Sequence, residues 1–283
     1  MTLFSLTSTR HCYFARRDSL RYEEQTQLVE EIPLAISINQ ITHAVMMVTP
    51  NHLDNFAIGF AFSEGIINGK QDVRDIQLEE TTIAHLGITG LALNLDISPR
   101  QFAHFKQHKQ AHLGATGCGL CGKDSLEQAL PLLEPLPASQ TLPTDILKTL
   151  REMLFAHQDL GKKSGAIHAA LLLSPEGHPI ICLEDIGRHN ALDKIIGYAI
   201  NHNIPLHNHS VVMSSRCSTE LIQKAVRATL SNLIHLASPS TLAVSLARRL
   251  GLTLIHLPKK DEPRIFASSF HVDHTEEQGL SKN

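Results

Sequence analysis

Two cysteines, Cys118 and Cys121, lie three residues apart in the glycine-rich segment GCGLCGKD at residues 117–124. Cysteine reacts as its thiolate, and nearby positive charge favours that form. Lys123 supplies such a charge, and Asp124 is a candidate N-cap that would place Cys121 just ahead of the partly positive N-terminus of a helix. Cys118 stands between two glycines, which restrict the backbone little. The pattern predicts a mobile pair that accepts sulfur as a persulfide on one thiol and releases it when the second thiol forms a disulfide.

A CxxC pair also suits other roles. It is often half of a zinc site, but such a site needs four ligands, and the nearest histidines, His104, His108 and His112, form no second close pair. A thioredoxin-like redox pair belongs to a βαβ unit, whereas this pair lies in mid-chain. A zinc deaminase carries a proline before its CxxC, and Gly117 stands there instead. We therefore expect no metal, and keep as the alternative a non-catalytic cofactor-binding chaperone whose CxxC is structural.

A second cluster, EDIGRHNALDK at residues 184–194, follows a predicted strand and opens a predicted helix. Its arginine can bind phosphate through two parallel hydrogen bonds, and a helix N-terminus favours anions. Its first aspartate could receive the amino edge of a base or orient the histidine. We expect a ligand-binding loop whose contact residues are Asp185, Gly187, Arg188, His189 and Asn190. The competing interpretation is a structural ion-pair network of Asp185, Arg188 and Asp193.

A third cluster, SSRCS at residues 214–218, again joins a predicted strand to a predicted helix. Hydroxyl groups and an arginine at a helix start suit a phosphate or a carboxylate, so Ser215 and Arg216 are candidate ligand contacts. Helix capping by Ser218 alone explains the segment about equally well. Cys217 is expected to be a small buried residue rather than a nucleophile.

The segment SPS at residues 238–240 repeats this arrangement, with Ser238 as a candidate contact. Active residues of layered α/β folds gather in loops at the carboxyl ends of strands. Three such loops at one sheet edge would form a pocket for a large phosphate-bearing ligand. His168 lies on an apolar strand, where a satisfied core histidine is the usual finding, but it also lies where these loops are expected to converge.

The chain divides into four predicted regions. Residues 1–25 are expected to form a flexible arm, and residues 26–100 a small α+β domain. Residues 101–125 are expected to be a mobile linker, partly helical, that carries the CxxC. Residues 126–283 are expected to form an α/β cofactor-binding domain with a loose C-terminal tail, starting with a helix at 126–133.

The larger domain shows a strand-then-helix rhythm that predicts a layered α/β sheet with several parallel pairs. Strands are expected at residues 167–173, 179–183, 210–214, 232–237 and 252–257. Helices are expected at residues 145–157, 190–201, 219–230 and 241–250.

The composition is that of an ordinary soluble protein, with 42% hydrophobic and 19% charged residues. A formal net charge of -3 gives no reason to expect nucleic acid or an anionic membrane as partner. No apolar run is long enough to cross a bilayer, and residues 1–20 lack the apolar core of a signal peptide. The odd number of five cysteines argues against a disulfide scaffold. We therefore expect a cytoplasmic protein, because thiols stay reduced in that compartment.

These motifs together resemble the formate dehydrogenase accessory sulfurtransferases, the FdhD family. The three main segments are GCGLCGK at residues 117–123, EDIGRHNALDK at 184–194 and SPSTLA at 238–243. Shorter N-terminal segments are also similar to that family: EIPL at residues 31–34, IGF at 58–60 and SEG at 63–65. The resemblance runs from about residue 30 to residue 257.

The resemblance implies a cytoplasmic homodimer that takes sulfur from a cysteine desulfurase. The sulfur passes to the molybdenum bis(molybdopterin guanine dinucleotide) cofactor, which is then inserted into formate dehydrogenase. It also implies a cytidine-deaminase-like layered α/β/α C-terminal domain without the deaminase zinc, beside a smaller α+β N-terminal domain. Cys118 would carry the persulfide, Cys121 would assist, and the guanine dinucleotide would lie in the pocket of the three loops.

Two segments depart from the family pattern. Where the family has a glycine before its arginine, this chain has Ser215 before Arg216. The segment after the last predicted strand is usually rich in glycine and arginine, whereas this chain has PKKDEPR at residues 258–264. The cations expected to take over those cofactor contacts are Lys259, Lys260 and Arg264.

Overall fold

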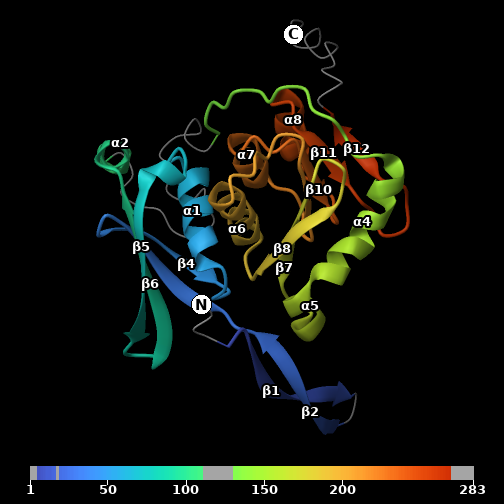
Figure 1. Ribbon diagram of the computed structural model, residues 1–283. Helices are drawn as coiled ribbons and strands as arrows, with labels where there is room; N and C mark the ends of the chain where they lie inside the picture. The colour runs from blue at the N-terminus through green and yellow to red at the C-terminus, as the bar shows by residue number, and fades with distance from the viewer. Residues whose placement is uncertain (1–4, 17–18, 111–129, 269–283) are drawn as a thin grey trace, which may run out of the picture.

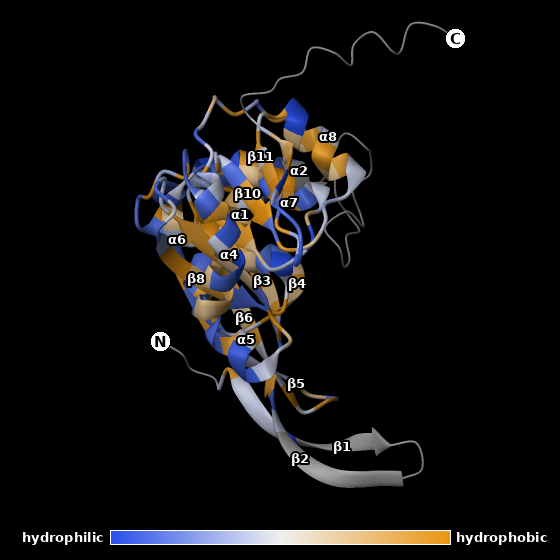
Figure 2. Cartoon of the chain, turned by 90° about the vertical axis from the view of Figure 1, so that its right-hand side faces the viewer, coloured by the Kyte–Doolittle hydropathy of each residue, from blue (hydrophilic) through white to orange (hydrophobic). Residues whose placement is uncertain are grey.

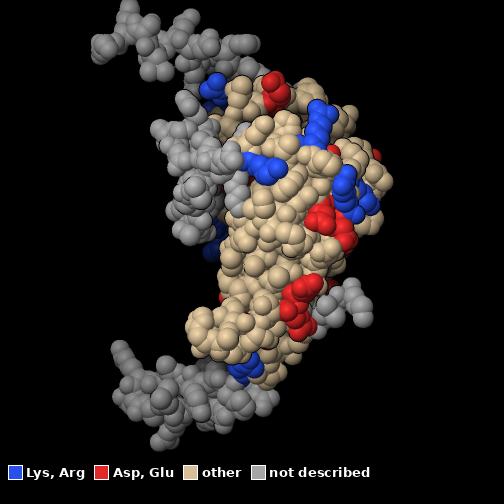
Figure 3. Space-filling model, turned by 90° about the vertical axis from the view of Figure 1, so that its left-hand side faces the viewer, with Lys and Arg blue, Asp and Glu red and all other residues tan. Residues whose placement is uncertain are grey.

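The computed structural model describes residues 5–16, 19–110 and 130–268, which form a hairpin, a four-stranded sheet and a six-stranded sheet with their helices (Figure 1). Strands and inward helix faces carry most of the hydrophobic residues (Figure 2). None of the helices in these ranges is long and apolar enough to span a membrane. On the face seen in Figure 3, basic and acidic side chains are interspersed, without a large area of one sign. The α/β class predicted from the sequence is confirmed.

The chain begins with an antiparallel hairpin of β1 (Thr7–Arg16) and β2 (Ser19–Val29). Figure 1 shows it projecting away from the two sheets. Residues 1–25 were expected to form a flexible arm, and the hairpin there was not anticipated, while their flexibility stays a prediction. The hairpin sequence shows no apolar alternation, so a pairing defined by backbone hydrogen bonds leaves little trace in the residue pattern.

The first sheet has the strand order β4-β3-β6-β5 and buries one face against α1. Its elements are β3 (Ile32–Ile38), β4 (Ile41–Val48), α1 (Leu53–Ser63), the 3-10 turn η1 (Lys70–Asp72), β5 (Val73–Ile83), β6 (Ile88–Ile97) and α2 (Pro99–Gln110). Asn39 and Gln40 have positive φ angles of 44° and 66°, which fits the tight turn predicted between β3 and β4. Alternate residues of β3, Leu34, Ile36 and Ile38, are buried, so the period of two fixes the face that meets α1.

Helix α1 begins later than the sequence suggested. Thr49 and Pro50 were expected to open it, but the helix starts at Leu53, after His52 in a left-handed conformation with φ 50° and ψ 39°. Thr49 instead lies in a buried link between β4 and α1, where its polar groups contact the second sheet unit.

The second sheet has the strand order β12-β11-β10-β9-β7-β8. Its strands are β7 (His168–Leu173), β8 (Pro179–Asp185), β9 (Ser210–Met213), β10 (Asn232–His235), β11 (Thr253–His256) and β12 (Arg264–Ala267). Strands β9, β10 and β11 are parallel, and β7 is antiparallel to both β8 and β9. Strand β8 therefore runs in the same direction as β9, β10 and β11, and all four end at one edge of the sheet.

Helices cover both faces of this sheet. Helix α4 (Thr144–His157) packs on one face, followed by the short α5 (Asp159–Ser164). The other face is covered by α6 (Arg188–Asn201), α7 (Thr219–Arg227) and α8 (Thr241–Arg249). This is a three-layer α/β/α arrangement, as expected, while its likeness to cytidine deaminases stays a prediction.

The helix expected at residues 126–133 lies partly outside the described residues, and the part that is described, residues 130–133, is not helical. Proline at four positions of residues 130–143 removes backbone donors and disfavours a helix there. The strand at residues 252–257 was expected to be the last one, which is wrong, because β12, a four-residue edge strand antiparallel to β11, follows it.

The two sheet units meet where α1 crosses α6 at very short range. A Cβ atom built on Gly59 would lie 1.8 Å from the carbonyl oxygen of Asp193, and one built on Gly197 would lie 1.8 Å from the carbonyl oxygen of Asn55. Only glycine permits this approach of two helix backbones. The crossing fixes the N-terminal unit against the middle of α6, whose first turn forms part of the candidate site.

Candidate functional site

The three loops singled out in the sequence do converge. They follow β8, β9 and β10, whose carboxyl ends share one edge of the sheet. An open pocket of about 680 Å³ lies at this edge, within the range of small-molecule sites. Its walls include residues of α4, α5, β7 and the first two loops: Phe155, Gln158, Lys162, His168, Ile186 and Ser214.

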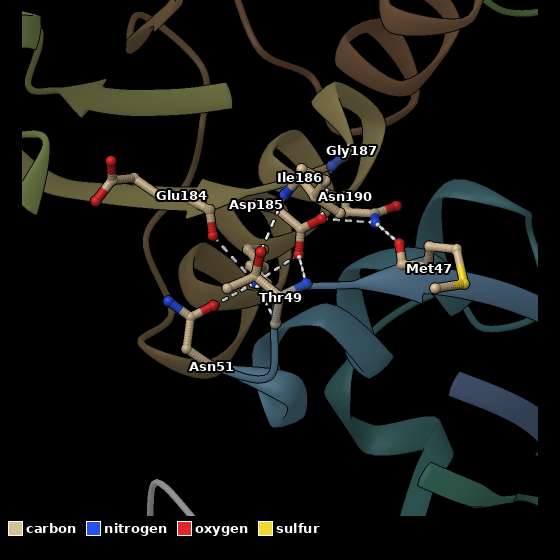
Figure 4. A network of polar contacts seen from close by, with 9 residues as sticks. Met47, Thr49, Asn51, Glu184, Asp185, Ile186, Gly187 and Asn190 are labelled. Atoms are coloured by element: carbon tan, nitrogen blue, oxygen red, sulfur yellow. Dashed lines mark hydrogen bonds and ion pairs between the residues drawn. The ribbon is translucent and has the colours of Figure 1, made fainter. Parts of the chain in front are cut away.

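Asp185 precedes the wall residue Ile186 and is completely buried. Figure 4 shows its polar contacts. One carboxylate oxygen accepts hydrogen bonds from the Gly187 N–H and the Asn190 Nδ2, both at 2.8 Å. The other accepts the Thr49 N–H at 3.1 Å and pairs with Lys194 Nζ at 2.7 Å. Asp185 and Asn190 are thus used internally, which does not support a ligand contact, and their role in binding stays a prediction. For Asp185 the competing interpretation of a structural network holds, with Lys194 as the cation rather than Arg188.

Lys194 completes this network from the second turn of α6. Besides Asp185, its ammonium contacts three oxygens: the carbonyls of Thr49 and Glu184, both at 3.1 Å, and the Asn51 Oδ1 at 2.5 Å. Burial lowers the pKa of Lys194, and Asp185 opposes that effect. The ammonium therefore binds together β8, α6 and the link that precedes α1.

Arg188 and His189 form the first turn of α6 and remain partly exposed. His189 was expected to be oriented by Asp185, but its Nε2 lies 2.8 Å from a Glu220 carboxylate oxygen and 3.4 Å from the Ser218 hydroxyl. Burial raises the pKa of Glu220, but the hydrogen bond and charge of His189, with Lys224 and Arg188, outweigh it and hold that pKa below its ordinary value. The buried Arg188 Nε has no hydrogen-bond partner among the described residues, which leaves a donor for a ligand at this edge.

His168 begins β7 at the same edge and lines the pocket. Burial lowers its pKa, as do the nearby charges of Arg188 and His189, while Asp185 acts in the opposite sense. Three groups able to carry positive charge therefore lie close together, and a bound anion would relieve their mutual repulsion.

The second loop, residues 214–218, contains both buried residues and an exposed arginine. Ser215 is buried, and its hydroxyl donates to the carbonyl of Arg216 at 3.1 Å, so its expected role as a ligand contact is not supported. The Ser215 carbonyl accepts the Nδ1–H of His235 at 3.1 Å, and burial lowers the pKa of His235 to about 3. Arg216 is exposed. Burial raises the pKa of Cys217 to about 12, which agrees with a packed residue rather than a nucleophile.

Ser238 is exposed after β10, and Ser240 caps α8 by accepting the Ala243 N–H at 3.2 Å. Lys259 and Lys260 line a second pocket of about 540 Å³ together with Arg151. Arg151 donates to the carbonyls that follow β10 and β11, so this second pocket lies at the same sheet edge.

Arg264 was expected to act as a further cofactor cation beside these lysines. The structure places it at the start of β12, outside the residues that line either pocket, with its guanidinium 2.7 Å from Asp261. Part of its charge is therefore already compensated.

Two wall residues were not predicted from the sequence: Phe155, near the end of α4, and Gln158, the residue after that helix. Lys162, from α5, belongs to a polar segment ahead of β7 that the sequence did indicate. Glu184 holds α5 in place, since its two carboxylate oxygens accept the N–H groups of Leu160 and Gly161 at 2.8 Å. In the sequence, the lysines ahead of β7, Lys162 and Lys163, indicated that this segment could contribute to the pocket.

Cys118 and Cys121 lie outside the described residues, as does the rest of their motif. Within the described ranges, no group of three or more His, Cys, Asp and Glu side chains is placed to hold a metal ion.

The fold and the polar sheet edge define a layered α/β protein with a ligand pocket at the carboxyl ends of its strands. Residues 29–273 match the model of the FdhD/NarQ family, and the chain belongs to that family.

Two relatives are both 36% identical and are both named sulfur carrier protein FdhD. The one from Variovorax paradoxus aligns over 89% of this chain and 88% of its own length, and the one from Cupriavidus necator over 88% and 84%. A crystal structure from Desulfotalea psychrophila, described as a formate dehydrogenase accessory protein, superposes with a TM-score of 0.70. It covers 93% of this chain and 98% of its own at 22% identity, which supports the fold.

Proposed function

We propose that this protein is a sulfurtransferase that carries persulfide sulfur from a cysteine desulfurase to the molybdenum bis(molybdopterin guanine dinucleotide) cofactor of formate dehydrogenase. The observation that carries the proposal is family membership over nearly the whole chain, with relatives named as sulfur carriers. The CxxC of residues 118–121 supplies the chemistry that such a carrier needs.

Sulfur transfer requires two steps at the cysteine pair. The Cys118 thiolate attacks the terminal sulfur of the desulfurase persulfide, the S–S bond of that persulfide breaks, and the desulfurase cysteine leaves as a thiolate. Cys121 then attacks the inner sulfur of the Cys118 persulfide, so that sulfide leaves with the bonding electron pair while a Cys118–Cys121 disulfide forms. The sulfide replaces an oxygen ligand of the substrate's molybdenum, with water as the other product, and a thiol reductant restores the pair.

The pocket at the sheet edge fits the phosphate-bearing part of this substrate. The unpartnered Arg188 Nε, the His168 ring and the Lys162 ammonium are cationic or potentially cationic groups at or beside one pocket. The N-terminus of α6 adds the partial positive charge of a helix end. In this proposal these groups hold the pyrophosphate, and the open mouth leaves the molybdenum end accessible.

The same proposal places the protein in the cytoplasm as a homodimer, with the desulfurase and formate dehydrogenase as its protein partners. The net charge of -3 and the mixed charges of Figure 3 favour neither nucleic acid nor an anionic membrane.

Formate dehydrogenase activity in cells that carry Cys118→Ala tests the function. We expect activity to be lost, and normal activity would contradict the assignment. Intact-mass measurement after incubation with a desulfurase and cysteine should show one added sulfur atom on the peptide that holds both thiols. Stoichiometric zinc that disappears when either cysteine is changed would instead favour a structural CxxC.

A further inference from the structure

Thr49 connects the N-terminal unit to the end of β8 and the loop after it, residues 185–187, and to Lys194 of α6. Its N–H, its hydroxyl and its carbonyl each form one of these bonds. Its N–H donates to Asp185 Oδ2, its hydroxyl oxygen accepts the Ile186 N–H, and its carbonyl accepts the Lys194 ammonium, each at 3.1 Å. The side chain is completely buried, so water does not compete for these bonds. Figure 4 shows Thr49 facing the loop from a separate part of the chain.

The hydrogen bond to Ile186 reaches the pocket itself. Ile186 is a wall residue, and the first turn of α6, with Arg188 and His189, starts two residues later. A shift of the Ile186 backbone would therefore move the pocket wall and the helix start together. Functional geometry tolerates displacements of only about 0.5 Å, so such a restraint has consequences for binding.

Neighbouring residues of the same link strengthen the connection. The Met47 carbonyl accepts Asn190 Nδ2 at 2.9 Å, and the Asn51 side chain accepts Lys194 Nζ. His52 then adopts a left-handed conformation, which non-glycine residues rarely take without surrounding restraints. The link between β4 and α1 is thus shaped to meet the loop rather than to extend the helix.

We propose that Thr49 is a positioning residue through which the N-terminal unit sets the geometry of the pocket wall. The inference rests on the proposed function, because it concerns the pocket that would hold the guanine dinucleotide. It assigns to the N-terminal unit a part in ligand binding, although in the described ranges that unit contributes no wall residue to this pocket.

Guanosine diphosphate, which carries the base and both phosphates of the nucleotide half, is the probe, and its affinity is measured by titration calorimetry. Thr49→Val keeps the shape of the side chain but leaves the Ile186 N–H without its acceptor. We expect roughly tenfold weaker binding. Thr49→Ser keeps the hydroxyl and should bind within about twofold of the unchanged protein.

Ser63→Ala is the matched control. The Ser63 hydroxyl also bonds from the N-terminal unit to α6, to Asp193 at 2.7 Å, but it does not touch the loop. This variant should lower the melting temperature while leaving affinity for guanosine diphosphate unchanged. Equal affinities of Thr49→Val and the unchanged protein would overturn the inference alone. Absence of binding by the unchanged protein would overturn the proposed pocket as well.

A second measurement needs no variant. Because coupling between two sites is reciprocal, guanosine diphosphate should slow backbone hydrogen exchange at residues 47–51 as well as at residues 184–190. Slower exchange at the loop alone would contradict the role of Thr49, even if Thr49→Val did not fold.

Discussion

Two buried lysine–aspartate pairs each have one residue on α6, Lys194 and Asp193, and the groups around the two pairs differ. Lys194 pairs with Asp185 at 2.7 Å beside the pocket, among backbone carbonyls and an amide. Lys224 pairs with Asp193 at 2.8 Å between α6 and α7, with Glu64 3.8 Å away. Burial lowers the pKa of both lysines, but the carboxylates around Lys224 reverse the effect and raise its pKa, whereas the pKa of Lys194 stays lowered. The second pair joins helices, while the first also shapes the loop beside the pocket.

Removing the lysine of either pair should cause the largest loss of stability. Lys194→Met and Lys224→Met each leave a buried carboxylate without its cation, so each should lower the free energy of unfolding by about 3–5 kcal/mol, measured by urea denaturation. At a temperature where both variants are folded, only Lys194→Met should weaken binding of guanosine diphosphate. Equal losses of affinity would remove the distinction between the two pairs.

Gly197→Ala tests the crossing that holds both pairs in place. The added Cβ would overlap the Asn55 carbonyl, so α1 and α6 must separate, and we expect roughly 3 kcal/mol of lost stability. Gly90→Ala on β6 is the control, since its nearest new contact would be 3.3 Å away. Similar melting temperatures for the two variants would mean that the close crossing contributes little.

His168, in the wall of the pocket, predicts that ligand affinity depends on pH. His168 has a pKa lowered by burial, Arg188 and His189, and a bound phosphate should raise it. Protonation then accompanies binding, so affinity for guanosine diphosphate should be highest below the free-state pKa. It should fall by up to roughly tenfold as the pH rises through the bound-state pKa.

Calorimetry in buffers of different ionisation enthalpy measures the proton uptake. His168→Gln should abolish most of it, whereas His178→Gln, an exposed histidine at the opposite edge of the sheet, should not. Unchanged uptake in His168→Gln would assign the proton to another group.

The smallest loss of stability is expected for a substitution of Cys217, which is buried in the loop after β9. Cys217→Ala should cost about 1 kcal/mol of stability through lost packing and leave sulfur loading unchanged, since a thiol with a pKa raised to about 12 stays protonated. Mass measurement after desulfurase treatment checks this. Loss of loading would show that sulfur passes through Cys217.

The sequence predicted the strands of the large sheet because each is an apolar run that ends in a polar loop, and shared strand direction then brings the loops together. It could not decide whether Asp185 meets a ligand or an ion pair. That choice depends on burial by Thr49, which lies 136 residues earlier in the chain. The part of the wall formed by Phe155 and Gln158 was not predicted, because it depends on how α4 packs over the sheet.

The most direct test follows sulfur and cofactor separately in protein purified from cells. The unchanged protein should carry the molybdenum cofactor with added sulfur. Cys118→Ala should carry the cofactor without that sulfur, and Arg188→Gln should take up persulfide but retain little cofactor. Sulfurated cofactor on the Cys118→Ala protein would contradict the account.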